Sequence, residues 1–222
     1  DLHLIAQKVH QETDGIPLFL NAFIKQLVKE KVLVRYNNKY IWQKTPAQII
    51  EQNFDIPISI RHLVKQKLTR YSEEQITLLE LLAVSDRPIQ IEILIEILGW
   101  SENKIFDALE YLLQDKVVST QKKDLAEYFE LSRRKFSEVL YEDLTIKNRR
   151  HLHSQIAELL QNHHPLPNLS VLQQIGEHYR CANQPGEAFV NLCQAGIKLW
   201  ERGLFSAALH NMKLAQRDHL NS

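Results

Sequence analysis

SEEQITLLELLAVSDRPIQIEILIEILGWSENKIFDALEYLLQDKVVSTQKKDLAEYFEL, residues 72–131, carries three amphipathic segments and then two short β-prone segments. Ser72 and Gln75 match a capping box, so we expect the first helix to begin there. Pro88 is expected to open the second helix and Gly99 to end it, because proline suits a first helical turn and glycine readily takes the left-handed conformation after a last turn. The stretch therefore begins as a stack of helices.

The third helix of this stretch is expected to begin at Ser101, a favourable N-cap residue. Behind it, VVST, the polar turn QKKD and AEYFEL indicate two short strands. Three helices followed by a two-stranded wing is the order of a winged helix, which we predict for residues 72–131. The predicted buried face of the third helix consists of Ile105, Phe106, Leu109, Leu112 and Leu113.

The charge of the third helix bears on DNA binding, since such helices often lie in the major groove. From Ser101 to Lys116 it has two basic and four acidic residues, a net charge of −2. Only Lys122 and Lys123, at the tip of the wing, would attract phosphate. Because each phosphate contact needs a cation, we expect a protein-contacting winged helix. The alternative is a DNA-binding transcriptional regulator with a helical dimerisation region.

Upstream, ETDGIPLFLNAF (residues 12–23) interrupts a helical pattern with Gly15-Ile16-Pro17. Gly15 can take the left-handed conformation that ends one helix, and Pro17 suits the first turn of the next. Two interpretations remain open from the residues. The segment is a boundary between two helices, or its constrained backbone presents a rigid apolar ring to a ligand or a neighbouring domain.

A β-hairpin is expected at VLVRYNNKYIW, residues 32–42. Its β-branched and aromatic residues flank Asn37-Asn38, a pair that tolerates positive φ. IPISIRHLVKQKLTRYS then predicts a helix of about three turns, with apolar residues on one face. Residues 1–71 are therefore expected to form a helical segment with one small hairpin.

Residues 132–222 are predicted to be helical throughout. Residues 132–168 hold two amphipathic helices, which we interpret as a linker. Residues 169–222 resemble the start of tetratricopeptide (TPR)-like helix pairs, with turns at Pro185-Gly186 and Gly203 and small residues set against large ones. Such an array of about one and a half units lacks a stacking partner, so an apolar flank near Leu209, Met212 and Leu214 is expected to be exposed. The small residues are Ala182, Ala188, Ala195, Gly196, Ala207, Ala208 and Ala215, and the large ones Tyr179, Phe189, Leu192, Trp200 and Phe205.

Composition limits the classes of partner. The 222 residues include 27 basic and 27 acidic ones, so net charge does not attract the chain to nucleic acid or to an anionic membrane. No apolar run approaches the roughly 20 residues of a membrane span. Cys181 and Cys193 lack the spacing of a zinc pair and the density of a disulfide scaffold, so we expect free thiols in a reducing, cytoplasmic compartment. The chain begins at Asp1 within an amphipathic pattern, and we interpret it as a piece of a longer protein.

No catalytic residue and no metal site is predicted. The chain lacks the glycine spacing of a P-loop and a glycine-flanked serine nucleophile, and it has no hydrophobic strand ending in acidic residues that could hold Mg²⁺. Neither His151 with His153 nor His163 with His164 has the i, i+4 spacing of a helical zinc site. His178 is expected to pack or to hydrogen-bond between helices.

One local surplus of basic residues surrounds the first linker helix. It is either a solvated face with intrahelical ion pairs to Glu138, Glu142 and Asp143, or a patch that binds phosphate or a partner. Its members are Arg133, Arg134, Lys135, Lys147, Arg149 and Arg150.

The order of these motifs resembles the region downstream of the ATPase core in STAND-class signal-transduction ATPases, in particular the AAA-type regulators of LuxR-like factors, adenylyl cyclases and bacterial multidomain kinases. The motifs are GIPLFL, the hairpin ending in Trp42, IPISIRHLVKQKL, the winged helix, KFSEVLYEDLTIKNRRHLHSQIAELL and IGEHYRCANQPGEAFVNLCQAG, which together cover nearly the whole chain. The chain departs from the family at Ile16, where relatives usually have Asn. It also departs before Phe136, where many relatives have a histidine in a Phe-x-His pattern and this chain has Arg133, Arg134 and Lys135.

The resemblance implies that residues 1–71 are a lid-like segment and that Gly15 and Pro17 lie beside a nucleotide in the whole protein. It implies ATP or ADP with Mg²⁺ in a core upstream of Asp1, and no cofactor in this segment. We therefore expect a non-catalytic relay that couples the nucleotide state of that core to a protein effector or ligand through helical repeats. Its partners would be the upstream core and further repeats of the same chain, with nucleic acid and membrane disfavoured.

Overall fold

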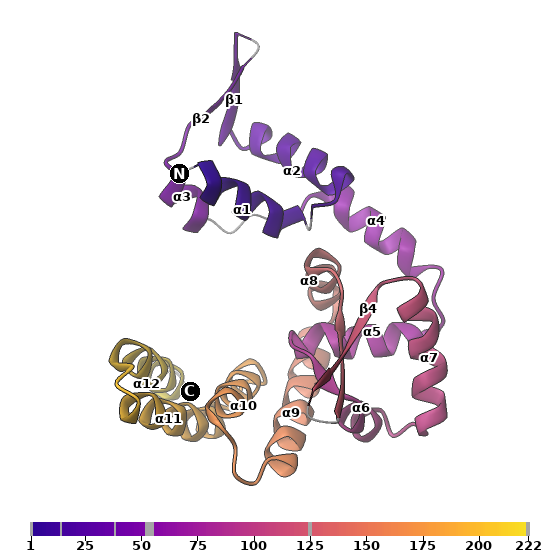
Figure 1. Ribbon diagram of the computed structural model, residues 1–222, viewed down its shortest axis with the longest axis vertical. Helices are drawn as coiled ribbons and strands as arrows, with labels where there is room; N and C mark the ends of the chain where they lie inside the picture. Colours follow the sequence, from indigo (N-terminus) through magenta and orange to yellow (C-terminus); the bar gives the residue numbers. More distant parts are fainter. Residues whose placement is uncertain (1, 14, 38, 52–55, 124–125, 221–222) are drawn as a thin grey trace.

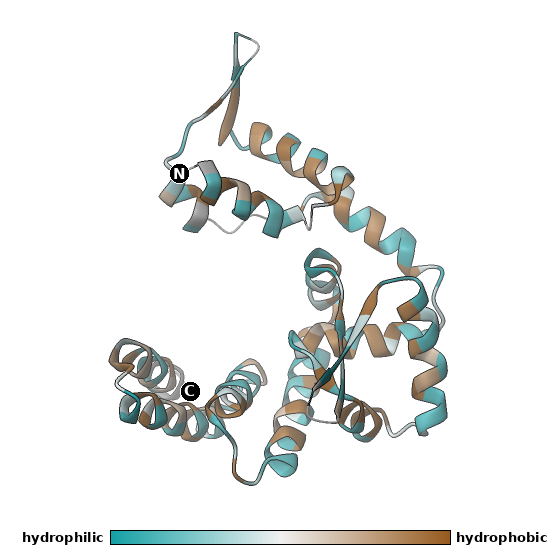
Figure 2. Cartoon of the chain, viewed as in Figure 1, coloured by the Kyte–Doolittle hydropathy of each residue, from teal (hydrophilic) through white to brown (hydrophobic). Residues whose placement is uncertain are grey.

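The computed structural model describes residues 2–13, 15–37, 39–51, 56–123 and 126–220. Within these residues the protein is mainly α, as predicted, with twelve helices and two small antiparallel sheets. The chain follows an open arc in Figure 1, from the N-terminal helices at the top, through the central helices and wing, to the last helices at the lower left. In Figure 2 apolar and polar residues alternate along the helices, as expected for helices that bury one face.

The N-terminal part consists of four helices and the predicted hairpin, which projects from the body in Figure 1. The second helix has Pro17 in its first turn, and Gly15 precedes it with φ 65°. Asn37 takes φ 45° in the hairpin turn, and Asn38 lies outside the described residues. A small core of Ile5, Phe23, Leu27, Val32, Leu33 and Ile49 holds this part together. The elements are α1 (Leu2–Thr13), α2 (Pro17–Lys29), β1 (Leu33–Tyr36), β2 (Lys39–Trp42), α3 (Pro46–Glu51) and α4 (Ile58–Leu68).

The next elements follow the winged-helix order. They are α5 (Glu73–Ser85), β3 (Ile89–Gln90), α6 (Ile91–Leu98), α7 (Glu102–Gln114), β4 (Val118–Lys123) and β5 (Ala126–Leu131). The capping box of Ser72 and Gln75 is present, and Ser101 caps α7. The prediction that Pro88 opens a helix was wrong, because Ile89 and Gln90 pair with Phe129 and Tyr128 of β5 and the helix begins two residues later.

The inward face of α7 is narrower than predicted. Ile105, Leu109 and Leu112 are fully buried, at spacings of four and three residues. Phe106 is 41% exposed, so its assignment to the core was wrong. It follows Ile105 directly and therefore lies about 100° around the helix from that buried position.

The last five helices continue from the wing without a break in the core. They are α8 (Arg134–Asp143), α9 (Ile146–His163), α10 (Leu169–Cys181), α11 (Pro185–Glu201) and α12 (Phe205–Leu220). One hydrophobic cluster runs from Phe19 through α5–α7 to Phe136, Ile156 and Ala188. The winged helix therefore shares its core with α4, α8, α9 and α10.

Close contacts join the last three helices. A Cβ on Gly176 would lie 2.7 Å from Leu192, and one on Gly196 would lie 3.0 Å from Met212. Asn183 (φ 62°) and Gly203 (φ 74°) make the two turns between the helices. Small residues at the contacts agree with the prediction, but Phe189, Trp200 and Phe205 do not fill them, because these side chains are 37–59% exposed.

Both hairpins leave a helix through the same backbone turn. Lys31 and Lys116, each one residue beyond the C-cap of α2 and α7, take φ 57° and 54°. The following residue then donates its N–H back to the helix, from Val32 to the Leu27 carbonyl (2.9 Å) and from Val117 to the Leu112 carbonyl (3.0 Å). This is a Schellman-type helix end, and it sets the direction in which each hairpin departs.

Replacing Leu109 by alanine should destabilise the winged helix by about 2–5 kcal/mol, because it leaves a cavity in a fully buried site. Urea unfolding followed by circular dichroism measures this change. Phe106→Ala on the same helix is the matched control and should cost less than about 1 kcal/mol. A change within about 0.5 kcal/mol for Leu109→Ala would mean that the buried face of α7 is misassigned.

Candidate functional site

Gly15 and Pro17 form a helix boundary, and the two residues have different surroundings. The Ile16 N–H donates to the Thr13 carbonyl (2.9 Å), and a Cβ on Gly15 would meet the His10 ring at 2.8 Å. Gly15 lines an apolar groove of about 400 Å³ together with Ile5, Val9, Leu20 and Trp42. Pro17 is exposed and is not among the residues that line the groove. The geometry thus gives the boundary predicted from the sequence, and the nucleotide contact remains a prediction.

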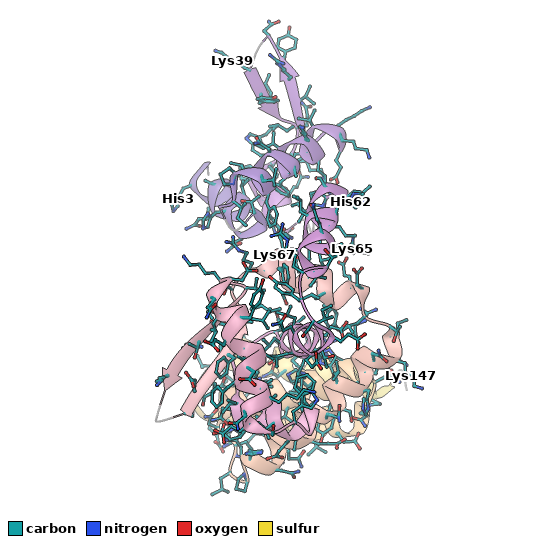
Figure 3. The ribbon with its side chains drawn as sticks, turned by 90° about the vertical axis from the view of Figure 1, so that its right-hand side faces the viewer. His3, Lys39, His62, Lys65, Lys67 and Lys147 are labelled. Atoms are coloured by element: carbon teal, nitrogen blue, oxygen red, sulfur yellow. The ribbon has the colours of Figure 1, made fainter. Side chains whose placement is uncertain are left out.

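The six basic residues singled out from the sequence do not form one surface. Arg134 is exposed and pairs with Glu138 (2.7 Å), whereas Lys135 is only 2% exposed. The Arg149 guanidinium lies over the Tyr141 ring, 5.0 Å from its centroid. Arg133 is half-buried and Arg150 exposed, and Figure 3 shows Lys147 projecting at the side of the lower part of the molecule.

The ion pairs of α8 partly differ from those predicted. Glu138 does pair within the helix, as expected. Glu142 pairs with Arg61 of α4 instead, and Asp143 pairs with Arg61 (3.4 Å) and Lys65 (3.1 Å). The prediction of intrahelical partners was wrong for these two carboxylates, because Arg61 and Lys65 of α4 lie close enough to pair with them.

A buried ion pair connects α1 to α8. The Lys135 ammonium lies 2.5 Å from Glu12 and 2.7 Å from Glu138, and Lys8 lies 3.0 Å from the other oxygen of Glu12. Burial alone would raise the pKa of Glu12, but its hydrogen bonds to Lys135 and Lys8 and their charges outweigh this and hold the pKa below its usual range. Glu12 is therefore an ionised carboxylate held in the interface between the two helices.

Sequence reasoning missed Glu12, although the sequence contained a signal. Ile5, Val9 and Glu12 stand at spacings of four and three, so the carboxylate occupies the apolar face of α1. A charge on an apolar face needs a buried partner. The partner itself could not be deduced, because Lys135 lies in a distant part of the sequence.

A second polar contact joins α8 to α9 and α10. Tyr141 of α8 hydrogen-bonds His153 of α9 (Oη to Nε2, 3.1 Å), and His153 hydrogen-bonds His178 of α10 (Nδ1 to Nδ1, 2.8 Å). Both rings are 5% exposed. The expectation that His178 hydrogen-bonds between helices is confirmed, and His151 faces solvent on the other side of α9.

The two histidines must carry complementary tautomers, since one Nδ1 has to donate and the other to accept. Two neutral rings satisfy this in either direction, whereas two protonated rings would both donate. Burial, reinforced by Arg149, lowers the pKa of His153 to about 4. Burial, followed by the charges of His153 and Arg87, lowers the pKa of His178 to about 3. At neutral pH the pair is therefore an uncharged bridge between helices.

A pocket of about 520 Å³ lies beside this bridge. Its walls include Arg87 after α5, Glu130 of β5, Arg134 and Tyr141 of α8, and His153. Charges of both signs line it, so it has no strong preference for an anion or a cation. Among the described residues no group of three or more His, Cys, Asp or Glu side chains could hold a metal ion.

The outward face of α7 is acidic and aromatic. Glu102, Asp107 and Glu110 are exposed, with Phe106 and Tyr111 beside them. Lys104 lies over the Trp100 ring, 4.4 Å from its centroid, and also pairs with Glu74. This face would repel the phosphate backbone of DNA.

A scan against protein-family models found no match to this chain, and neither did a search of curated proteins or of solved structures. Across the described part of the chain, no helix combines the length and the apolar character needed to span a bilayer.

The histidine bridge should make stability depend on pH. Unfolded histidine has a pKa of about 6.5, so below that pH the unfolded state binds protons that the buried rings do not. Stability should therefore be full above about pH 7 and fall as the pH drops from about 6.5 to about 4, by on the order of 7 kcal/mol for the two rings together. Urea unfolding at a series of pH values measures the loss.

Two variants separate this effect from other titrations. His178→Gln keeps a hydrogen-bonding side chain that does not titrate. It should roughly halve the slope of the profile between about pH 6.5 and pH 5, since only the buried His153 ring then contributes. His151→Gln, on the exposed side of α9, should leave the profile unchanged. Equal slopes for the two variants would show that the bridge does not cause the pH dependence.

Proposed function

We propose that this chain is a non-catalytic relay segment of a larger signal-transduction ATPase. In this proposal α8 transmits the position of the N-terminal helices to the helical pairs α10–α12. The observation that supports it most is the pair of buried polar contacts on α8. Lys135 near its start binds Glu12 of α1, and Tyr141 near its end binds His153 of α9.

Burial explains why these contacts couple the parts. Moving α1 away from α8 would leave a carboxylate and an ammonium without each other in a poorly solvated site, and moving α9 would break the histidine bridge. Both changes are costly compared with the loss of a surface ion pair. A shift of the N-terminal helices is therefore transmitted as a displacement of α8 as a rigid body.

The remaining parts of the proposal rest on the resemblance stated above. The nucleotide, ATP or ADP with Mg²⁺, would bind a core outside this chain, with Gly15 and Pro17 beside it. The helical pairs would contact a protein effector. Cys181 and Cys193 form no disulfide, which suits a reducing compartment, and we place the protein in the cytoplasm.

The alternative, a DNA-binding winged-helix regulator, has less support. The acidic exposed face of α7 lacks the cations that phosphate contacts require. Strongly salt-dependent binding of duplex DNA at physiological ionic strength would favour this alternative over the relay.

Lys135→Met tests the relay. The variant leaves Glu12 buried with Lys8 only, so it should lower stability by about 2–4 kcal/mol. In hydrogen exchange, α1 should lose protection, and the loss should extend through α8 to α9 and α10. Arg134→Met is the matched control, since it removes the neighbouring cation, which pairs with the same Glu138 but at the surface. It should change stability by less than about 1 kcal/mol.

The exchange pattern decides between coupling and simple local docking. If Lys135→Met raises exchange only in α1 and the first turn of α8, then α8 does not transmit the change and the relay is wrong. If both variants behave alike, burial of the ion pair is not what couples the parts.

The chain by itself should bind ATP no more tightly than about 1 mM. Most of the binding free energy for ATP comes from backbone amides and a lysine that hold the phosphates and from Mg²⁺, and the sequence lacks a P-loop. Titration calorimetry with ATP and Mg²⁺ measures the constant. A micromolar constant would reveal a nucleotide site in this chain and overturn its non-catalytic assignment.

A further inference from the structure

One face of α11, continued by the start of α12, exposes large apolar side chains. We call it the α11–α12 face. Their exposed fractions run from 37% for Phe189 to 59% for Trp200. The members are Phe189, Val190, Ile197, Trp200, Phe205 and Leu209.

The α11–α12 face is continuous. At about 100° per residue, the four members on α11 fall within an arc of roughly 100° that contains no charged side chain. Phe205 and Leu209 stand at i and i+4 on α12. The rings of Trp200 and Phe205 are in edge-to-face contact, with centroids 4.7 Å apart, and this contact joins the two helices into one surface.

The area of this face is large for a monomer. Side chains of this size each present on the order of 200 Å², and about half of each is exposed, so the six give roughly 600 Å². This is the upper end of what single soluble proteins expose. With a polar rim added, it approaches the ~800 Å² per partner that a stable protein–protein contact buries.

We propose that two copies of this chain associate through the α11–α12 face around a two-fold axis. In such an isologous contact each surface must be complementary to itself. With the two α11 helices antiparallel, Val190 of one copy lies opposite Trp200 of the second copy, so a small side chain meets a large one. The apolar area and this register therefore fit a contact between two copies of the chain.

Sedimentation of the 222-residue chain over a range of concentrations tests the proposal. The 26.0 kDa monomer should give way to a species of twice that mass as concentration rises. Trp200→Glu should raise the dimer dissociation constant at least about 100-fold, because it puts a charge at the centre of the contact. Leu166→Glu, which changes a 95% exposed leucine between α9 and α10, is the matched control and should leave dimerisation unchanged.

A second readout keeps the test independent of folding defects. Cys193 is half-buried within the arc of this face, whereas Cys181 is exposed outside it. Alkylation of Cys193 should slow at concentrations that form the dimer, while alkylation of Cys181 should not. Trp200→Glu should abolish the difference while its circular dichroism stays unchanged, and Ile197→Lys should act in the same way.

A wild-type chain that remains monomeric at about 1 mM would overturn the dimer and leave the face to another protein. A dimer that persists in both Trp200→Glu and Ile197→Lys would also overturn it, since the contact would then lie elsewhere.

Discussion

The buried pair of Glu12 and Lys135 is the constraint on which the arrangement of this molecule depends. Removing a carboxylate and an ammonium from water costs several kcal/mol for each ion, and that cost is offset only when the two meet in good geometry. The apolar faces of α1 and α8 could slide past each other, but the two charges cannot. A hydrophobic contact alone would be enough to hold the N-terminal helices against the rest of the protein. The ion pair adds a choice of one register for that contact.

Helix α8 can connect the N-terminal helices to the rest of the protein because its apolar contacts and its polar contacts lie at different positions along its length. Phe136, Val139 and Leu140 anchor it in the main hydrophobic cluster. Its polar contacts lie near the ends, where they reach α1, α4 and α9. The contacts with α4 involve half-exposed side chains and contribute little to stability individually. The buried contacts therefore determine the geometry, and the exposed ones add to it.

Local chemistry in the sequence was sufficient to predict most elements of the fold. It failed where the conformation or burial of a residue depends on a partner far away in the sequence. The capping box at Ser72, the hairpin around Asn37 and the break at Gly15 depend on neighbouring residues, so a single sequence specifies them. The strand at Ile89 forms only because β5 supplies its partner, and Pro88 gave a misleading signal. In the candidate site, His178 was assigned correctly by type, but its bond to His153 depends on how three helices pack. Lys135 was taken for a surface residue because runs of basic residues are usually solvated.

The shared turn after α2 and α7 has a consequence for the hairpin that stands free. The β4–β5 hairpin is extended by a third strand, β3, which pairs with β5, whereas β1–β2 projects with Tyr36 and Tyr40 more than half exposed. Figure 3 shows Lys39 near its tip. Main-chain hydrogen bonds at the end of α2 set its direction, and the buried side chains of Val32 and Leu33 hold its base in the small core. The β1–β2 hairpin therefore has its orientation before any partner binds, so binding there would cost little conformational entropy. Substitutions at the tip can therefore change the contacts of the hairpin without changing its orientation.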